Sequence, residues 1–216
     1  MPIVQPHLDY EMMFKAEGYL PVAGLDEAGR GAWAGPVAAG AVILPIEQAD
    51  LPEQLKGVRD SKTCTHLQRD RLYDVIFQVA ISAAVGMASA DEIDEIGVVP
   101  ATRLAMRRAV EQLSPDPHSL LIDYIHLHEV NLPQRSIKRG DNHSFSIAAA
   151  SIIAKVSRDR LMIEMGEIYP GYGFGQHKGY GTRQHQAALA KLKPCPIHRQ
   201  SFSPVRTRLI DVESVS

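Results

Sequence analysis

The sequence predicts an α/β domain in which a mixed β-sheet carries helices on its faces, followed by a C-terminal helical extension. Two short apolar segments near the start are separated by a glycine-rich turn, as in a β-hairpin. Farther along, strand-like segments alternate with helical ones, which is typical of a sheet with helical crossovers. After about residue 165 a glycine-rich loop and one amphipathic helix follow, which predicts the extension.

The first half of the chain contains three predicted strands and one long helix. Residues 21–25 and 36–44 are the hairpin strands, and residues 28–35 form the turn between them. After a polar connection, Thr63 or Thr65 caps a helix. The apolar face of this helix is expected to consist of Leu67, Leu72, Val75, Ile76 and Val79. Small and β-branched residues at 81–89 predict the third strand.

The second half begins with a short acidic helix at 90–96 and a longer helix that starts near Pro100. Residues 119–122 predict a buried strand that ends at Asp123, and residues 134–137 a further strand. The strongest helix signal covers 144–165, where small residues near its start allow another element to approach closely. Thr182 caps a last amphipathic helix.

Length and composition fit one ordinary globular domain with a small appendage. The chain has 216 residues, of which 45% are hydrophobic and 22% charged, and this excludes collagen, coiled coils and disordered chains. We divide it into a tail or short helix (1–20), a main domain (21–165) and a helical extension packed on that domain (166–216). Every apolar run is far shorter than the roughly 18–20 residues of a membrane span, so no membrane partner is expected.

Charge is distributed unevenly along the chain. Residues 1–130 hold 10 Lys and Arg against 19 Asp and Glu, whereas residues 131–216 hold 13 against 6. A basic last third indicates an anionic partner, although a helical surface of uneven charge gives the same pattern. Cys64 and Cys195 are isolated, which predicts reduced thiols and a cytoplasmic protein.

Acidic residues follow or precede several of the predicted core elements. Asp26 and Glu27 end the first strand, Asp123 ends a later strand, and Asp141 precedes the long helix. Each has an ordinary alternative: a solvated strand end, or helix capping for Asp141. Neighbouring side chains of a strand point to opposite faces, so Asp26 and Glu27 serve one site only if the chain bends at Glu27. Converging carboxylates suit two hard divalent cations that together promote phosphodiester hydrolysis.

These acids belong to longer motifs that resemble ribonuclease HII, the type 2 ribonuclease H. The resemblance extends over about residues 20–205 and rests on motifs that follow one another in order. They are DEAGRG (26–31), DSK (60–62), GD (140–141), SIAAASIIAKVSRD (146–159), YGF (172–174), HKGYGT (177–182) and HRQSF (198–202).

The resemblance implies a ribonuclease H-like fold with a five-stranded mixed sheet and a C-terminal helical extension. It implies an endonuclease that cleaves the RNA strand of RNA–DNA hybrids and incises duplex DNA 5′ to a single ribonucleotide, leaving 3′-hydroxyl and 5′-phosphate ends. Two Mg²⁺ or Mn²⁺ ions are expected during catalysis, held by Asp26, Glu27, Asp123 and Asp141. The family often has glycine after the third of these acids, where this chain has Tyr124.

The resemblance also implies substrate-binding residues, which are Gly29, Arg30, Gly31, Lys62, Lys155, Arg158 and Tyr180. The glycine turn is expected to read the ribose 2′-hydroxyl through backbone groups, since this group alone distinguishes ribose from deoxyribose. Tyr180 is expected to stack on the deoxyribose that follows the ribonucleotide. The three basic residues are expected to contact phosphates, and Lys155 and Arg158 share one helix face. Without the resemblance, each feature has an ordinary explanation. The glycines could form a plain turn, Tyr180 could anchor its loop, and the basic residues could belong to a solvated face.

Other functions remain open from the sequence. One is the type 3 ribonuclease H activity on long hybrids; that type usually carries an extra N-terminal domain, whereas only about 20 residues precede the first strand here. Others are a non-catalytic nucleic-acid binder and a protein interaction module. We expect a monomer that acts on hybrids and ribonucleotide-containing DNA, and a sliding-clamp partner that could contact the tail at 203–216 is left open.

Overall fold

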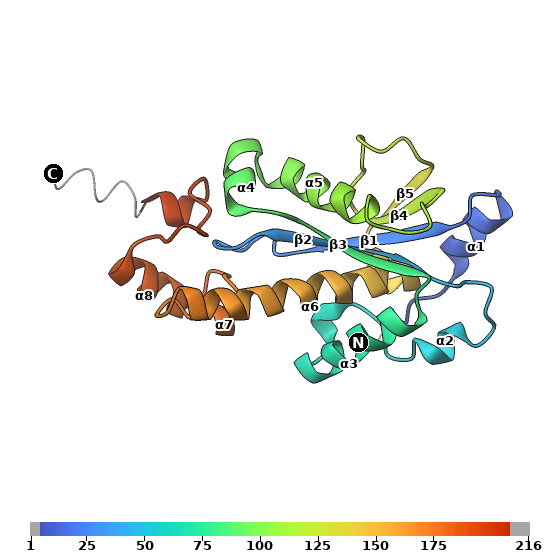
Figure 1. The fold of residues 1–216 in the computed structure, drawn as a ribbon, viewed down its shortest axis with the longest axis horizontal. Coiled ribbons are helices and arrows are strands. Elements are labelled where there is room, and N and C mark those ends of the chain that lie inside the picture. The colour runs from blue at the N-terminus through green and yellow to red at the C-terminus, as the bar shows by residue number, and fades with distance from the viewer. Residues whose placement is uncertain (1–4, 208–216) are drawn as a thin grey trace.

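The computed structural model describes residues 5–207 and contains one five-stranded mixed sheet (Figure 1). Its strands are β1 (Val22–Ala28), β2 (Val37–Ile43), β3 (Ser82–Ala88), β4 (Ser119–Asp123) and β5 (Gln134–Ile137). They lie in the order β3-β2-β1-β4-β5. β1 and β2 form the predicted antiparallel hairpin, β3 pairs antiparallel with β2, and β4 and β5 continue parallel to β1.

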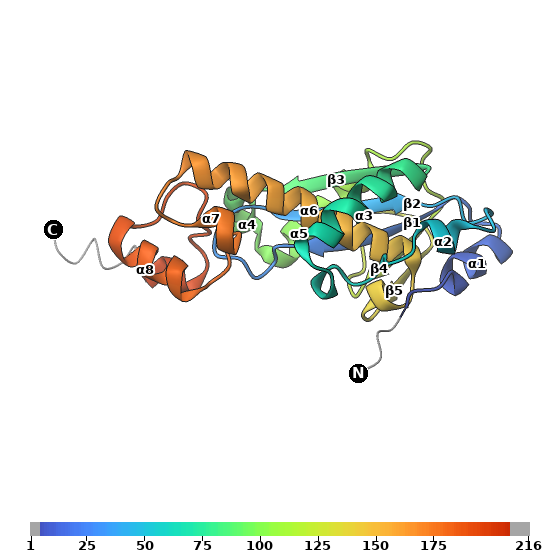
Figure 2. The ribbon, with the colours of Figure 1, turned by 90° about the horizontal axis from the view of Figure 1, so that it is seen from below.

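Helices cover both faces of the sheet, as the sequence predicts. The helices α4 (Ala90–Ile96) and α5 (Val98–Val110) lie on one face, and α3 (His66–Val79) and α6 (Phe145–Ile168) on the other (Figure 1). Figure 2 shows α6 running along the sheet. A side chain at Gly40 on β2 would collide with the carbonyl oxygen of Ala150. This glycine and the alanines of α6 therefore allow the helix to lie directly on the strands.

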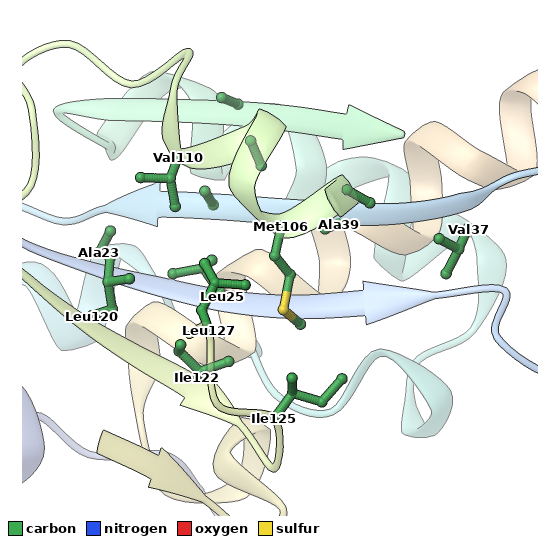
Figure 3. Packing of buried hydrophobic residues seen from close by; sticks show 14 of the residues in the cluster. Ala23, Leu25, Val37, Ala39, Met106, Val110, Leu120, Ile122, Ile125 and Leu127 are labelled. Atoms are coloured by element: carbon green, nitrogen blue, oxygen red, sulfur yellow. The ribbon is translucent and has the colours of Figure 1, made fainter. Parts of the chain in front are cut away.

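The core between the sheet and α5 consists of aliphatic side chains from alternate strand positions (Figure 3). Leu25 on β1 and Ile122 on β4 are fully buried and meet Met106 from α5. Strand residues with this alternation turn one set of side chains toward α5 and the other toward α6. Both acids at the ends of β1 and β4 are therefore carried by strands that the core holds in place.

The N-terminal segment forms α1 (Asp9–Ala16), at the end of the molecule opposite the C-terminal helices (Figure 1). Phe14 is buried, and so is the carboxylate of Glu11. One oxygen of Glu11 accepts the hydroxyl of Ser144 at 2.6 Å and the backbone N–H of Ser146 at 2.9 Å. A negative charge at this end of α6 is favourable, because unpaired N–H groups give a helix N-terminus a partial positive charge.

The predicted helix caps are found where the hydroxyl side chains stand. Thr65, rather than Thr63, caps α3 and forms a reciprocal capping box with Gln68. Thr182 caps α8 (Arg183–Leu192), and Ser144 caps α6. One assignment is wrong: Leu67, expected on the apolar face of α3, is 83% exposed because it lies in the first turn, where nothing covers the helix.

Short helices interrupt segments that the sequence predicts as loops. They are α2 (Leu51–Gln54), the 3-10 helices η1 (Ser61–Thr63) and η2 (Gly140–Asn142), and α7 (Phe174–His177). α7 and α8 pack on the last turns of α6 through Met162, Phe174 and Ala188. The proposed boundary after residue 165 falls inside α6, so the extension shares a helix with the main domain. Over residues 5–207, no helix is both long and apolar enough to cross a membrane.

Candidate active site

Asp26 and Asp123 lie side by side because their strands are adjacent and parallel. Leu25 of β1 is in register with Ile122 of β4, and each acid is the next residue along its strand. Parallel neighbours end at the same edge of a sheet, where sites of open sheets are usually built. Asp26 is only 4% exposed, although a carboxylate at a solvated strand end would be open to water.

Glu27 contributes to the same site although it follows Asp26 on one strand. Its backbone N–H donates to Oδ1 of Asp26 at 2.7 Å. Its side-chain Oε1 accepts from Nη1 of Arg30 at 3.0 Å, while Oε2 is buried and has no hydrogen-bond partner. Burial is the largest cause that raises the pKa of Glu27. The negative charge of Asp123 raises it further, while Arg30 lowers it. The two neighbouring acids therefore share one negatively charged region.

Asp141 joins this region through η2. It is not the cap of α6, because Ser144 accepts the N–H of Ile147 in that position. The backbone N–H of Gly140 donates to Oδ1 of Asp123 at 2.8 Å, which ties η2 to the end of β4. A surface pocket of about 420 Å³ opens here; its lining residues are Asp60, Lys62, Asp123, Arg139, Asp141 and Asn142.

The carboxylates raise one another's pKa. Burial is the largest cause for Asp26, followed by the charges of Glu27 and Asp123, and its pKa lies well above the usual value. Burial, Asp60 and Asp123 raise the pKa of Asp141 to about 6. Partial burial lowers the pKa of Lys62, but the charges of four surrounding carboxylates outweigh it and raise the pKa. The site concentrates negative charge that a cation would stabilise.

The donors present fit hard divalent cations. All four acids offer oxygen ligands, and the buried Oε2 of Glu27 is left without a partner. Within the part of the chain that the structure describes, no group of three or more acidic, histidine or cysteine side chains is arranged so that it could hold a metal ion. Magnesium suits such an open arrangement because it keeps several waters and takes few carboxylates. His126 and His128 stack on each other, with ring centroids 4.6 Å apart.

The glycine turn packs against two buried arginines. Gly29 has a φ of 92°, and a side chain there would collide with the guanidinium of Arg158. Arg199 donates to the carbonyl oxygens of Gly29 and Arg30, each at 2.8 Å. Gly31 faces open space. The turn thus has one side fixed by the protein and the other side free for a ligand.

Lys155 and Arg158 both approach the ring of Tyr180 but differ in their surroundings. The Lys155 ammonium lies 5.6 Å from the ring centroid, donates to Asp159 at 2.7 Å and is 20% exposed. Arg158 is fully buried and donates to the carbonyl oxygens of Pro36, Lys178 and Ala34. Arg158 donates to groups within the protein and is closed to solvent. The expected phosphate contact is therefore corrected: we assign Arg158 a structural role.

A model of the family described as Ribonuclease HII matches residues 23–205 of this chain. The chain belongs to the ribonuclease HII family. The ribonuclease HII of Geobacter sulfurreducens is 52% identical over 201 residues, which cover 93% of this chain and 90% of that protein. The ribonuclease HII of Chloroflexus aurantiacus is 48% identical over 208 residues, covering 96% of this chain and 98% of that protein.

Solved structures of ribonucleases H share the fold. The ribonuclease H2 of Pyrococcus horikoshii superposes with a TM-score of 0.71 at 23% identity, over 89% of this chain and 98% of that one. The ribonuclease HII of Archaeoglobus fulgidus, solved in complex with PCNA, superposes with a TM-score of 0.71 at 24% identity, over 85% of this chain and 96% of that one. Bst ribonuclease HIII, solved in complex with Mn²⁺, superposes with a TM-score of 0.69 at 20% identity, over 89% of this chain and 70% of that one. The predicted ribonuclease H-like fold is confirmed.

Membership of the ribonuclease HII family makes the chain an endoribonuclease, a hydrolase that acts on RNA in hybrids. The departure at Tyr124 has a backbone explanation. This residue has a φ of 58°, in the left-handed region that glycine adopts most easily, and its ring is 67% exposed. The chain therefore keeps a glycine-like backbone after Asp123 and carries the strain of a larger residue.

Sequence reasoning missed three residues that shape this site. Asp60 lies in the quoted DSK motif, but only its lysine was assigned a role; the structure places its carboxylate beside Asp141. Ser151 lies beside Asp26, whose pKa it lowers against the larger effect of burial, and its hydroxyl donates to Ser61 at 2.9 Å. Arg199 lies in the HRQSF motif, about 170 residues from the turn it contacts. The motifs were the only available signal for these residues.

Proposed function

We propose that this chain incises duplex DNA on the 5′ side of a single embedded ribonucleotide, in addition to cutting the RNA strand of hybrids. The products would be 3′-hydroxyl and 5′-phosphate ends. The observation that carries the proposal is the convergence of Asp26, Glu27, Asp123 and Asp141, from two strand ends and η2, on one charged region. Such incision is the first chemical step of ribonucleotide excision repair.

Asp26, Glu27, Asp123 and Asp141 would hold two divalent ions, Mg²⁺ or Mn²⁺. When bound, such ions lower the pKa of a water molecule and stabilise the oxygen that leaves the phosphate. The chemistry of the donors supports this, since all four are hard oxygen ligands and burial among like charges raises the pKa values of Asp26, Glu27 and Asp141. The Mn²⁺ complex of Bst ribonuclease HIII, a protein of the same fold, is in keeping with it.

The surrounding residues hold the acids in place and neutralise phosphate charge. The N–H of Glu27 donates to the Asp26 carboxylate, Ser151 lies beside that carboxylate, and Arg30 orients Glu27. Lys62 is exposed beside the acids and would bind a phosphate oxygen of the strand to be cut. Lys155 lies next to the ring of Tyr180 and would contact a neighbouring phosphate.

Selection of the ribonucleotide would come from the turn Gly29-Arg30-Gly31 and from Tyr180. The open side of the turn would bind the ribose 2′-hydroxyl through backbone groups. The ring of Tyr180 is partly exposed and flanked by two cationic side chains, so it would stack on the following deoxyribose. Together these groups would recognise an RNA-to-DNA junction.

We further propose a monomeric, cytoplasmic protein, in keeping with its two free cysteines. The solved complex of Archaeoglobus fulgidus ribonuclease HII with PCNA makes a sliding clamp the partner to test first. The segment 203–216 is the sequence candidate for that contact, and its last nine residues, 208–216, lie outside the described residues. Gel filtration of the chain, alone and with its own clamp, would decide both points.

The decisive experiment compares two duplexes that differ only in ribonucleotide content: one with a lone ribonucleotide and one with a continuous RNA strand. Each is cleaved in Mg²⁺ and in Mn²⁺, with product ends mapped by gel electrophoresis. We expect incision at the lone ribonucleotide, and an all-but-complete loss in Asp26→Asn but not in the exposed control Asp116→Asn. Cleavage of the continuous hybrid alone would favour the type 3 activity, and binding without cleavage a non-catalytic relative.

A further inference from the structure

The side chain of Arg199 donates to three backbone carbonyl groups, two in the glycine turn and one in the segment that leads to β2. Nη2 donates to Gly29 at 2.8 Å, Nη1 to Arg30 at 2.8 Å, and Nε to Gly35 at 2.9 Å. The side chain is fully buried. The planar guanidinium presents its donors in a fixed fork, so it fixes the relative orientation of these carbonyl groups.

This orientation determines where the N–H groups of the turn point. In a planar trans peptide, the carbonyl oxygen and the following N–H point in opposite directions. Since the carbonyl groups of Gly29 and Arg30 both point to Arg199, the N–H groups of Arg30 and Gly31 point away from it. Among the residues that the structure describes, neither N–H donates to an acceptor of the protein. Two adjacent, unpaired N–H groups form a concave donor site for an oxygen atom.

Arg199 has no acidic partner within ion-pair distance in residues 5–207. Burial lowers its pKa to about 9, so the side chain remains a cation at neutral pH. Burying a charge without a counter-ion is costly, and here the dipoles of three carbonyl groups offset the cost. A neutral side chain could fill the same space at a lower cost in free energy. Packing alone therefore does not explain why a cation is buried here.

We propose that Arg199 is a specificity-determining positioning residue, which holds the N–H groups of Arg30 and Gly31 toward the ribose 2′-hydroxyl oxygen. This inference rests on the proposed function, because it assumes that the turn reads the ribose. Lysine cannot replace the arginine here, since one ammonium group cannot span three carbonyl groups with the geometry of the planar fork.

The test is Arg199→Lys, with two kinetic readouts in Mg²⁺. The first is kcat/KM on a duplex with one ribonucleotide, and the second is the inhibition constant of an otherwise identical all-DNA duplex. We expect kcat/KM to fall about tenfold to 100-fold, as for a reactive group displaced by about an ångström, while the inhibition constant stays within twofold. A kcat/KM close to that of the wild type, or a parallel change in both values, would overturn the inference.

The control is Arg108→Lys, on the other face of the sheet. Arg108 also binds a backbone carbonyl group, that of Met87, and pairs with Glu92. Its replacement should lower the melting temperature and leave both kinetic values unchanged. If the wild type itself fails to incise at the lone ribonucleotide, the proposed function fails, whatever the variant does.

A measurement on the wild-type protein covers the case in which Arg199→Lys does not fold. In metal-free buffer, the amide resonances of Arg30 and Gly31 are followed by NMR during titration with each duplex. The ribonucleotide duplex should shift both resonances, and the all-DNA duplex should not. Equal shifts with both duplexes, or none with either, would contradict the assigned N–H orientation.

Discussion

The carboxylate of Asp123 accepts the backbone N–H of Gly140 at 2.8 Å, and this bond joins the end of β4 to the turn that carries Asp141. One oxygen of Asp123 therefore has a structural partner, and the residue also lines the pocket. This arrangement gives Asp123 two separable roles, one in holding η2 and one in the charge of the site.

Replacing Asp123 should separate those roles. Asp123→Asn keeps an oxygen acceptor for Gly140, so we expect little change in stability but a loss of turnover of at least about 100-fold. Asp123→Ala should lose turnover and also about 1 kcal/mol of stability, since a hydrogen bond is removed. Urea unfolding and initial rates on a lone-ribonucleotide duplex measure the two effects. Wild-type turnover in Asp123→Asn would remove this residue from the active site.

Asp26→Asn should stabilise the metal-free protein at pH 8, because it removes one of several buried, mutually repelling carboxylates. It should also reduce the rise in melting temperature that Mg²⁺ causes, since a ligand that binds only the folded state stabilises it. Differential scanning calorimetry with and without MgCl₂ tests both effects, with NaCl at equal ionic strength as the control. An identical Mg²⁺-dependent shift in both proteins would exclude Asp26 as a ligand.

Lys155→Ala and Arg158→Ala should have opposite consequences, although the residues are neighbours on α6. Loss of Lys155 should raise KM and reduce the salt dependence of binding by about one phosphate contact, with little change in stability. Loss of Arg158 leaves three carbonyl groups without donors and should cost about 3 kcal/mol or more. The exposed Lys191→Ala is the control for a general loss of charge. A stable Arg158→Ala with weakened binding would restore its phosphate role.

His185 and His198 should make stability depend on pH between about 4 and 6.5. Their Nε2 atoms lie 3.0 Å apart, and Nδ1 of His185 lies 3.0 Å from the carbonyl oxygen of Tyr180. Burial, with the charge of neighbouring histidines, lowers both pKa values to about 4. The unfolded chain then binds more protons in this window, so the stabilisation is complete above pH 6.5 and is lost as pH falls toward 4.

Urea unfolding at pH 7.5, 5.5 and 4.5 measures this dependence. We expect His198→Gln to make the pH profile less steep, because the variant exposes one titrating group fewer on unfolding while His185 remains. His118→Gln is the control, since His118 is exposed in the native protein. Equal slopes in the wild type and His198→Gln would show that the buried pair contributes nothing to the pH dependence.

Tyr124→Gly should increase the free energy of unfolding by about 0.5–1 kcal/mol. Glycine adopts a positive φ without the strain that a larger residue carries, and this gain exceeds its cost in chain entropy. The exposed tyrosine ring has little packing to lose. Tyr124→Ala is the control, because it removes the ring and keeps the strained backbone. A destabilised glycine variant would mean that the tyrosine ring makes a contribution larger than the strain.

The sequence alone determined the five strands, the longer helices and the positions of the acids along the chain. Thr65 and Thr182 cap helices as expected and Asp123 ends β4, whereas β1 continues past Asp26 to Ala28. These features depend on hydrogen bonds and side-chain periodicity within a few residues, so a local pattern is sufficient to predict them. The ordered motifs added the family and, with it, the sheet topology.

Only the tertiary structure decided which charged side chains remain accessible and which are buried among backbone acceptors. Lys155 and Arg158 share one helix face, yet the segments around Ala34 and Lys178 cover the arginine and supply its acceptors. Arg199 reaches the turn from 170 residues away, and Glu11 binds the start of α6 from 133 residues away. Burial and hydrogen-bond partners depend on segments that are distant in sequence, so no local pattern contains this information.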